Sequence, residues 1–188
     1  SERLAVGDSK GAHKIFKISF FSFALIGGIA TCILFLGAKK ISRDWIQIPE
    51  AENSIICLAP SIFFVSIIAV FRGYFNGRQQ MKVSARSQTL EQIFKTVLTI
   101  LIVEMIAIAS GVSTELMAAG ANLATTGATF LGFGYLFLFY KSQKEVVSNE
   151  IKQSVNYKNE QTIMIIRNIL FVSIPMALSA IMSSINKN

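Results

Sequence analysis

The chain has 188 residues, of which 52% are hydrophobic and only 15% are charged. Soluble domains carry about 25% charged residues, and long uncharged runs accompany the deficit here, so we exclude a water-soluble enzyme and expect an all-α polytopic membrane protein. The formal net charge is +7, but the basic residues lie between the apolar runs without interleaved aromatic residues, so we expect no nucleic-acid partner.

Five apolar segments are long enough to cross the roughly 30 Å hydrocarbon core of a bilayer as helices. They cover residues 18–38, 54–71, 90–110, 116–140 and 163–185. Pro60 lies within the second segment, where we expect a kink, because proline has no backbone N–H and a neighbouring helix or a Ser/Thr side chain must satisfy the freed carbonyl. Pro175 lies near the middle of the fifth segment.

The basic residues predict the orientation of these spans, because Lys and Arg collect on the cytoplasmic flanks of membrane helices. Fourteen of them lie before the first span, around the loop between the second and third spans, or around the loop between the fourth and fifth spans. Four lie on the opposite side. We therefore expect a multi-pass protein of the cell membrane whose N-terminal segment is cytoplasmic.

Residues 142–161 differ from the rest of the chain, because they are rich in Lys, Glu, Asn, Ser and Gln and nearly free of large apolar residues. This composition predicts a mobile cytoplasmic connector between two helical bundles. The chain begins with Ser and closes on Asn-Lys-Asn directly after an apolar segment. We interpret it as a fragment of a longer polytopic protein.

The sequence offers no pattern that is typical of an enzyme: no nucleophile with a base, no pair of carboxylates and no phosphate-binding glycine loop. Cys32 and Cys57 each lie in an apolar run without a partner at metal-ligand spacing. We expect both thiols to be buried as small apolar side chains, with no disulfide and no zinc site. We expect no catalytic residue, no metal site and no cofactor.

A polar stripe enters the membrane at the cytoplasmic end of the third span, where five residues share one face of a helical wheel: Gln88, Glu91, Gln92, Lys95 and Thr99. The stripe either borders a water-filled cavity or lies in the membrane interface with Glu91 and Lys95 paired at i,i+4. The second interpretation is favoured, because both charges can reach the headgroups. Glu104, deeper in the same span, is either a proton- or ion-coupling residue or an acid that reaches the outer interface.

The fourth span has two distinct faces. One is polar and contains Asn122, Thr125, Thr126 and Thr129, and the opposite one contains Gly120, Gly127 and Gly134. Glycines at this spacing allow another backbone to approach closely. The polar face lines a transport cavity in one interpretation, and in the other its threonines bond to their own backbone carbonyls.

Two stretches after the second span carry a family resemblance: RGYFNGRQQM at 72–81 and SQTLEQ at 87–92. They resemble the loop after the fourth helix in stage V sporulation protein B-like, lipid II-type oligosaccharide flippases of the multidrug/oligosaccharidyl-lipid/polysaccharide exporter superfamily. The opening residues 1–17 are similar to an earlier loop of that family. In the turn, we expect Gly73 and Gly77 to adopt close or left-handed backbone geometry and Arg72 to mark the membrane boundary.

The resemblance implies a fold of roughly fourteen helices in two lobes around a central cavity. Residues 1–141 would then be part of the N-terminal lobe, 142–161 the connector, and 162–188 the truncated first helix of the C-terminal lobe. Substrate-path candidates are the polar residues of two spans: Gln88, Gln92, Asn122, Thr125, Thr126 and Thr129. Glu104 is the coupling candidate.

The implied function is the translocation of a lipid-linked saccharide, such as a peptidoglycan precursor, across the bilayer by alternating access. A coupling cation and the membrane potential are the candidate energy sources. Two alternatives stay open from the sequence: a cation-coupled multidrug exporter of the same fold, and a membrane scaffold that transports nothing.

Overall fold

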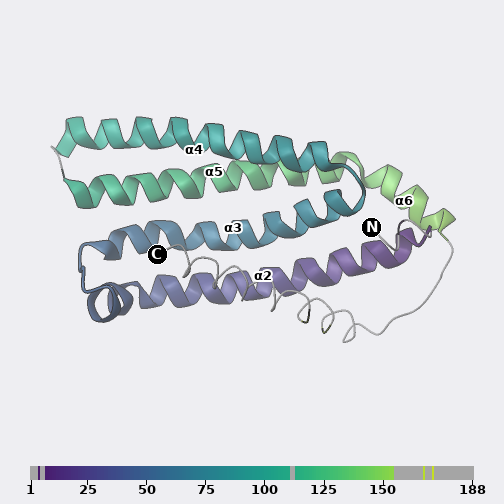
Figure 1. Ribbon diagram of the computed structural model, residues 1–188, viewed down its shortest axis with the longest axis horizontal. Coiled ribbons are helices and arrows are strands. Elements are labelled where there is room, and N and C mark those ends of the chain that lie inside the picture. The colour runs from purple at the N-terminus through teal and green to yellow at the C-terminus, as the bar shows by residue number, and fades with distance from the viewer. Residues whose placement is uncertain (1–3, 5–6, 111–112, 155–166, 168–170, 172–188) are drawn as a thin grey trace, which may run out of the picture.

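The computed structural model describes residues 4, 7–110, 113–154, 167 and 171 of the chain (Figure 1). In chain order its elements are α2 (Ser9–Lys40), the π-helical turn η1 (Ile41–Trp45), α3 (Ala51–Gly77), α4 (Met81–Ser110), α5 (Thr114–Ser142) and α6 (Lys144–Gln153). No strand occurs among the described residues. The described part of the chain is therefore all-helical, as the sequence predicted.

Within the described residues, four helices, one of which includes η1, are long and apolar enough to cross a membrane. The predicted spans at 18–38, 54–71, 90–110 and 116–140 each lie inside one of them, and each helix extends beyond its apolar run. The shortest of the four helices has 27 residues, which is about 40 Å of helix and exceeds the hydrocarbon core. The predicted fifth span, with Pro175, lies outside the described residues except for Arg167 and Phe171.

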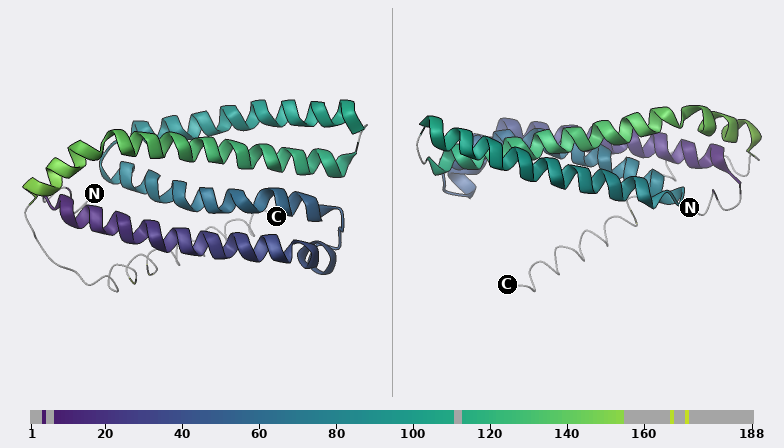
Figure 2. Two further views of the ribbon diagram at one scale, coloured as in Figure 1. Left: turned by 180° about the vertical axis from the view of Figure 1, so that it is seen from behind. Right: turned by 90° about the horizontal axis from the view of Figure 1, so that it is seen from above.

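The four long helices lie side by side in the order α2, α3, α5, α4 (Figure 1). Contacts are extensive between neighbours in this row, whereas α3 and α4 touch only sparsely. Seen from above, the helices overlap in one band, so the arrangement is an open layer (Figure 2). Such a layer leaves large apolar side chains exposed on its faces, among them Leu25, Ile29, Leu36, Met105, Ile108 and Leu138. These faces suit lipid or further helices and not water.

The buried core is concentrated at the end of the layer where α6 lies. The ring of Phe16 on α2 is 4.4 Å from that of Tyr74 on α3 and 5.2 Å from that of Tyr140 on α5, measured between centroids. Phe71 and Phe75 are almost fully buried beside them. Aromatic pairs at these separations add to the free energy gained by burying apolar area, so this cluster fixes α2, α3 and α5 to one another.

The start of the expected connector is helical. Helix α6 covers its residues Lys144–Gln153 and packs against α2 and α5, and its Val147 is only 5% exposed. Val147 and the partly buried Ile151 lie one helical turn apart, so they give this short, polar segment an apolar side to dock. Residues 155–161 of the expected connector lie outside the described part.

Candidate functional site

The polar face of α5 lies against α3 beside Pro60. Thr126 Oγ1 donates a hydrogen bond to the carbonyl oxygen of Cys57 at 2.6 Å, and Asn122 Nδ2 donates to the carbonyl oxygen of Ser54 at 3.4 Å. Because Pro60 has no backbone N–H, the helical hydrogen bond to the carbonyl oxygen of Ile56, four residues earlier, cannot form. The two α5 side chains donate to carbonyls on either side of Ile56, and α3 continues as one helix through Pro60.

Two further hydroxyls bond to α3 carbonyls next to Pro60. Thr31 Oγ1 of α2 donates to the carbonyl oxygen of Ala59 at 3.1 Å, and Ser61 Oγ donates to the carbonyl oxygen of Leu58 at 2.7 Å. Polar side chains from α2, α3 and α5 therefore converge on one turn of α3. None of these four bonds goes to Ile56, so a side-chain donor for the carbonyl that Pro60 frees stays a prediction.

The remaining threonines of this face bond within their own helix. Thr125 Oγ1 donates to the carbonyl oxygen of Ala121 at 3.1 Å. Thr129 Oγ1 lies 3.1 Å from the carbonyl oxygen of Thr125 and 2.9 Å from that of Thr126, and the residue is 3% exposed. This geometry agrees with intrahelical bonding, and a place for these residues on a substrate path stays a prediction.

Replacing Thr126 with valine should lower stability more than replacing Thr125 with valine. The first change removes a hydrogen bond between α5 and α3, at a cost of about 0.5–1.5 kcal/mol, whereas the second removes a hydroxyl bond that lies within α5 and joins no second helix. Thermal unfolding of the two purified variants in the same detergent measures the difference. Equal melting temperatures would mean that the interhelical bond contributes nothing.

The glycine face of α5 packs against side chains of α4, not against its backbone. A Cβ added to Gly120 would lie 2.6 Å from Ile106 Cδ1 and 2.8 Å from Ile102 Cγ2, and one added to Gly127 would lie 3.5 Å from Leu98 Cδ1. At Gly134 nothing lies within 4 Å. The expected close approach of another backbone is therefore wrong at all three glycines, and α4 side chains fill the space at Gly120 and touch Gly127.

An ion pair joins α3 to α4 within the layer. Arg72 Nη2 lies 2.6 Å from Glu91 Oε2, and the two side chains are 23% and 15% exposed. The same nitrogen lies 3.3 Å from Ser87 Oγ on α4. Glu91 also packs on α5, because its Cβ and Oε2 lie 3.5 Å from the position of a Cβ on Gly132. Three helices thus meet at one mostly buried charge pair.

This pair corrects the interpretation of the polar stripe. Glu91 pairs with Arg72 and not with Lys95, which is exposed. Gln88 and Gln92 are exposed as well, and Thr99 is partly buried. Local spacing could not reveal the pair, because its partners lie on different helices and 19 residues apart.

Glu104 is exposed on α4. It follows Gln88 by 16 residues, which at 100° per residue places it about 160° around the helix from the polar stripe. Glu104 therefore lies on a different side of α4 from Gln88 and Gln92, and its coupling role stays a prediction.

The glycines after the second span do not have the expected geometry. Helix α3 includes both Gly73 and Gly77, and neither has a positive φ angle. A Cβ on Gly73 would have nothing within 4 Å. The turn is formed afterwards, by Arg78–Gln80, and its left-handed residue is Gln79 with a φ of 59°. The expectation of left-handed backbone at either glycine, or of a close approach at Gly73, was wrong because the helix extends further than predicted.

Arg78, at the end of α3, attaches α6 to the layer. Its Nη2 lies 2.9 and 2.8 Å from the two carboxylate oxygens of Glu150, and its guanidinium carbon lies 5.6 Å from the centre of the Tyr74 ring. Gln80 Nε2 donates to Gln143 Oε1 at 3.3 Å in the same region. The Arg78 side chain is only 10% exposed, so its charge depends on Glu150 for compensation.

Replacing Glu150 with glutamine should release α6 from the layer. A charge-assisted hydrogen bond contributes about 1.5–3 kcal/mol, so hydrogen exchange of the α6 amides should become at least about tenfold faster. Glu145→Gln is the matched control, because Glu145 is an exposed acid on the same helix. If both variants exchange at the same rate, the ion pair does not hold α6.

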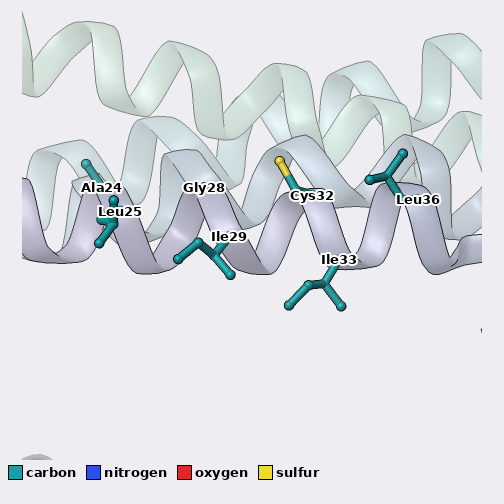
Figure 3. Close-up of a pocket in the computed structure, with 7 residues that line it drawn as sticks. All are labelled: Ala24, Leu25, Gly28, Ile29, Cys32, Ile33 and Leu36. Atoms are coloured by element: carbon teal, nitrogen blue, oxygen red, sulfur yellow. The ribbon is translucent and has the colours of Figure 1, made fainter.

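The pocket in Figure 3 is an apolar groove on α2. Its volume is about 450 Å³, and it is lined by Ala24, Leu25, Gly28, Ile29, Cys32, Ile33 and Leu36. Cys32 is exposed there, which contradicts the expectation of a buried thiol, because α2 is at the edge of the layer and no described residue covers this face. Cys57 is partly buried.

Within the described ranges, no group of three or more His, Cys, Asp or Glu side chains could hold a metal ion.

One protein family matches nearly the whole chain. Residues 5–188 match the family model described as polysaccharide biosynthesis protein. The chain belongs to this family. Two relatives come from Bacillus subtilis (strain 168). Stage V sporulation protein B is 27% identical over 78% of this chain, and the uncharacterized membrane protein YabM is 31% identical over 63% of it.

These relatives are much longer than the chain, which spans 28% of stage V sporulation protein B and 20% of YabM. No solved structure matches the chain. The family and the four long apolar helices together identify it as a multi-pass membrane protein of the polysaccharide biosynthesis family.

Proposed function

We propose that the protein containing this chain moves a lipid-linked saccharide across the membrane by alternating access. The observation that carries the proposal is the match of residues 5–188 to the polysaccharide biosynthesis family. The fold supports it, because an open layer of four spanning helices with two apolar faces suits one part of a larger helical assembly. In that assembly, α2 to α5 would belong to one of two lobes, the connector would begin after α5, and residues 163–185 would start the second lobe.

Transport suits the described residues better than catalysis does. Three of their polar contacts hold helices together: Thr126 with the Cys57 carbonyl, Arg72 with Glu91, and Arg78 with Glu150. The exposed amides of Gln88 and Gln92 are the first candidates for contact with a polar headgroup. Asn122, Thr125, Thr126 and Thr129 are second candidates, because reaching a substrate requires them to leave their present hydrogen bonds.

The decisive experiment reconstitutes the full-length protein in vesicles that contain a fluorescent lipid-linked saccharide. An impermeant quencher outside the vesicles then reports how fast the lipid changes leaflet. We expect faster exchange than in protein-free vesicles and slower exchange with the double variant Gln88→Leu and Gln92→Leu than with wild type. Wild-type rates equal to those of protein-free vesicles would refute the proposal. Efflux of a cationic dye without lipid exchange would support the multidrug-exporter alternative.

The orientation of the spans can be tested by thiol labelling of intact cells. In the full-length protein with Cys32 and Cys57 replaced by serine, a cysteine at Lys82 or Lys152 should resist an impermeant maleimide added outside, and a cysteine at Arg43 should react. All three positions are exposed, so a lack of reaction is not a consequence of burial. Reaction of the cysteine at position 82 with the external maleimide would show that the proposed orientation is wrong.

A further inference from the structure

The chain turns across the layer at the end opposite α6. After Lys40, the helix passes into the π-helical turn η1, which is seen nearly end-on in Figure 1 while α2 runs along the page. In the view from above, this segment leaves the band of long helices (Figure 2). If α2 crosses the bilayer, η1 therefore runs along the membrane plane. It follows the uncharged run that ends at Ala38, so it lies where the hydrocarbon core gives way to headgroups.

Hydrogen bonds hold this turn in one conformation. Ser42 is fully buried, and its Oγ donates to the carbonyl oxygen of Pro49 at 3.1 Å. The backbone N–H of Ile48 donates to the carbonyl oxygen of Ser42 at 2.9 Å, and that of Ile46 to Ile41 at 3.0 Å. Between them, Gln47 has a φ of 59°, a conformation that costs free energy for a residue other than glycine. Side-chain and backbone hydrogen bonds therefore define one conformation for residues 42–49.

This structure presents three large apolar side chains outward. Trp45 is 81% exposed, Ile46 46% and Ile48 51%. Exposed charges of both signs surround them. The basic residues are Lys39, Lys40 and Arg43, and the acidic residues are Asp44 and Glu50. The segment therefore offers apolar and aromatic surface without a dominant charge, which suits the boundary between headgroups and acyl chains more than it suits an anionic surface or a charged protein partner.

We propose that η1 and the loop to Pro49 form an interfacial anchor, which inserts Trp45, Ile46 and Ile48 into the headgroup–acyl boundary of the leaflet at that end. Exposed apolar side chains of α2, among them Leu25, Ile29 and Leu36, precede the anchor in the chain. The anchor fixes the depth of α2 and α3, which it connects. The proposal depends on the membrane location of the helices and not on the transported substrate.

Trp45 is the single tryptophan of this chain, so its fluorescence reports on the anchor directly. The full-length protein, with any tryptophan outside this chain replaced by phenylalanine, is reconstituted in phosphatidylcholine vesicles. We expect emission at a shorter wavelength than that of free tryptophan, weak quenching by acrylamide, and stronger quenching by lipid brominated near the headgroup than by lipid brominated near the chain end.

The double variant Ile46→Ser and Ile48→Ser should shift the Trp45 emission to longer wavelength and reduce quenching by the shallow bromines, with unchanged helical circular dichroism. Long-wavelength emission of the wild type with full acrylamide quenching would place Trp45 in water and overturn the proposal. Short-wavelength emission without quenching by either bromolipid would show that protein covers the residue, and would overturn it as well. Stronger quenching by the deep bromines would reject the interfacial position.

Discussion

Replacing Glu91 with alanine should destabilise the protein by about 3–5 kcal/mol, because it leaves the Arg72 guanidinium without its counter-charge among α3, α4 and α5. Only 23% of the Arg72 side chain is exposed, so water cannot fully replace the lost carboxylate. Arg86→Ala is the control on the same helix, since Arg86 is exposed and lies before the apolar run 90–110, and such surface changes stay within about 0.5 kcal/mol. Urea unfolding of the full-length variants in one detergent measures both values.

A double variant separates the net contribution of the Arg72–Glu91 ion pair to stability from the cost of leaving one of its charges unpaired. Replacing Arg72 with methionine and Glu91 with leucine together should recover most of the lost stability, because apolar side chains of similar volume often equal a buried ion pair. If Glu91→Ala unfolds at the same urea concentration as Arg86→Ala, the ion pair has no structural role. If the double variant is as unstable as Glu91→Ala, the contacts of these side chains matter more than their charges.

The spans were predictable because they depend on a local property of the sequence. An uncharged run of about 20 residues can satisfy its backbone and match the bilayer in one way only, as a helix. The ends of the helices were less predictable, since polar residues extend them. Helix α2 begins at Ser9, where the Asp8 side chain accepts a hydrogen bond from the N–H of Gly11 at 2.7 Å, nine residues before the predicted span.

The partners of the polar side chains were not predictable from local spacing. Glu91 had an apparent partner four residues away in Lys95, but its real partner, Arg72, comes from another helix. Arg78 and Glu150 lie 72 residues apart, and Thr126 bonds to a carbonyl 69 residues away. A helical wheel identifies which residues share a face, whereas the neighbour of that face is decided by the packing order of the helices.

The layer also predicts that two adjacent glycines of α2 respond in opposite directions to the same change. A Cβ on Gly27 would lie 2.8 Å from Ser66 Cβ and 3.6 Å from Phe63 Cα on α3, atoms that cannot move without shifting that helix. Gly27→Ala should therefore cost about 1–3 kcal/mol through overpacking. A Cβ on Gly28 would meet nothing within 4 Å, so Gly28→Ala should raise stability by up to about 1 kcal/mol through helix propensity. Urea unfolding of the two variants tests the packing of α2 on α3, and a Gly27→Ala protein as stable as Gly28→Ala would show that the two helices are not in this register.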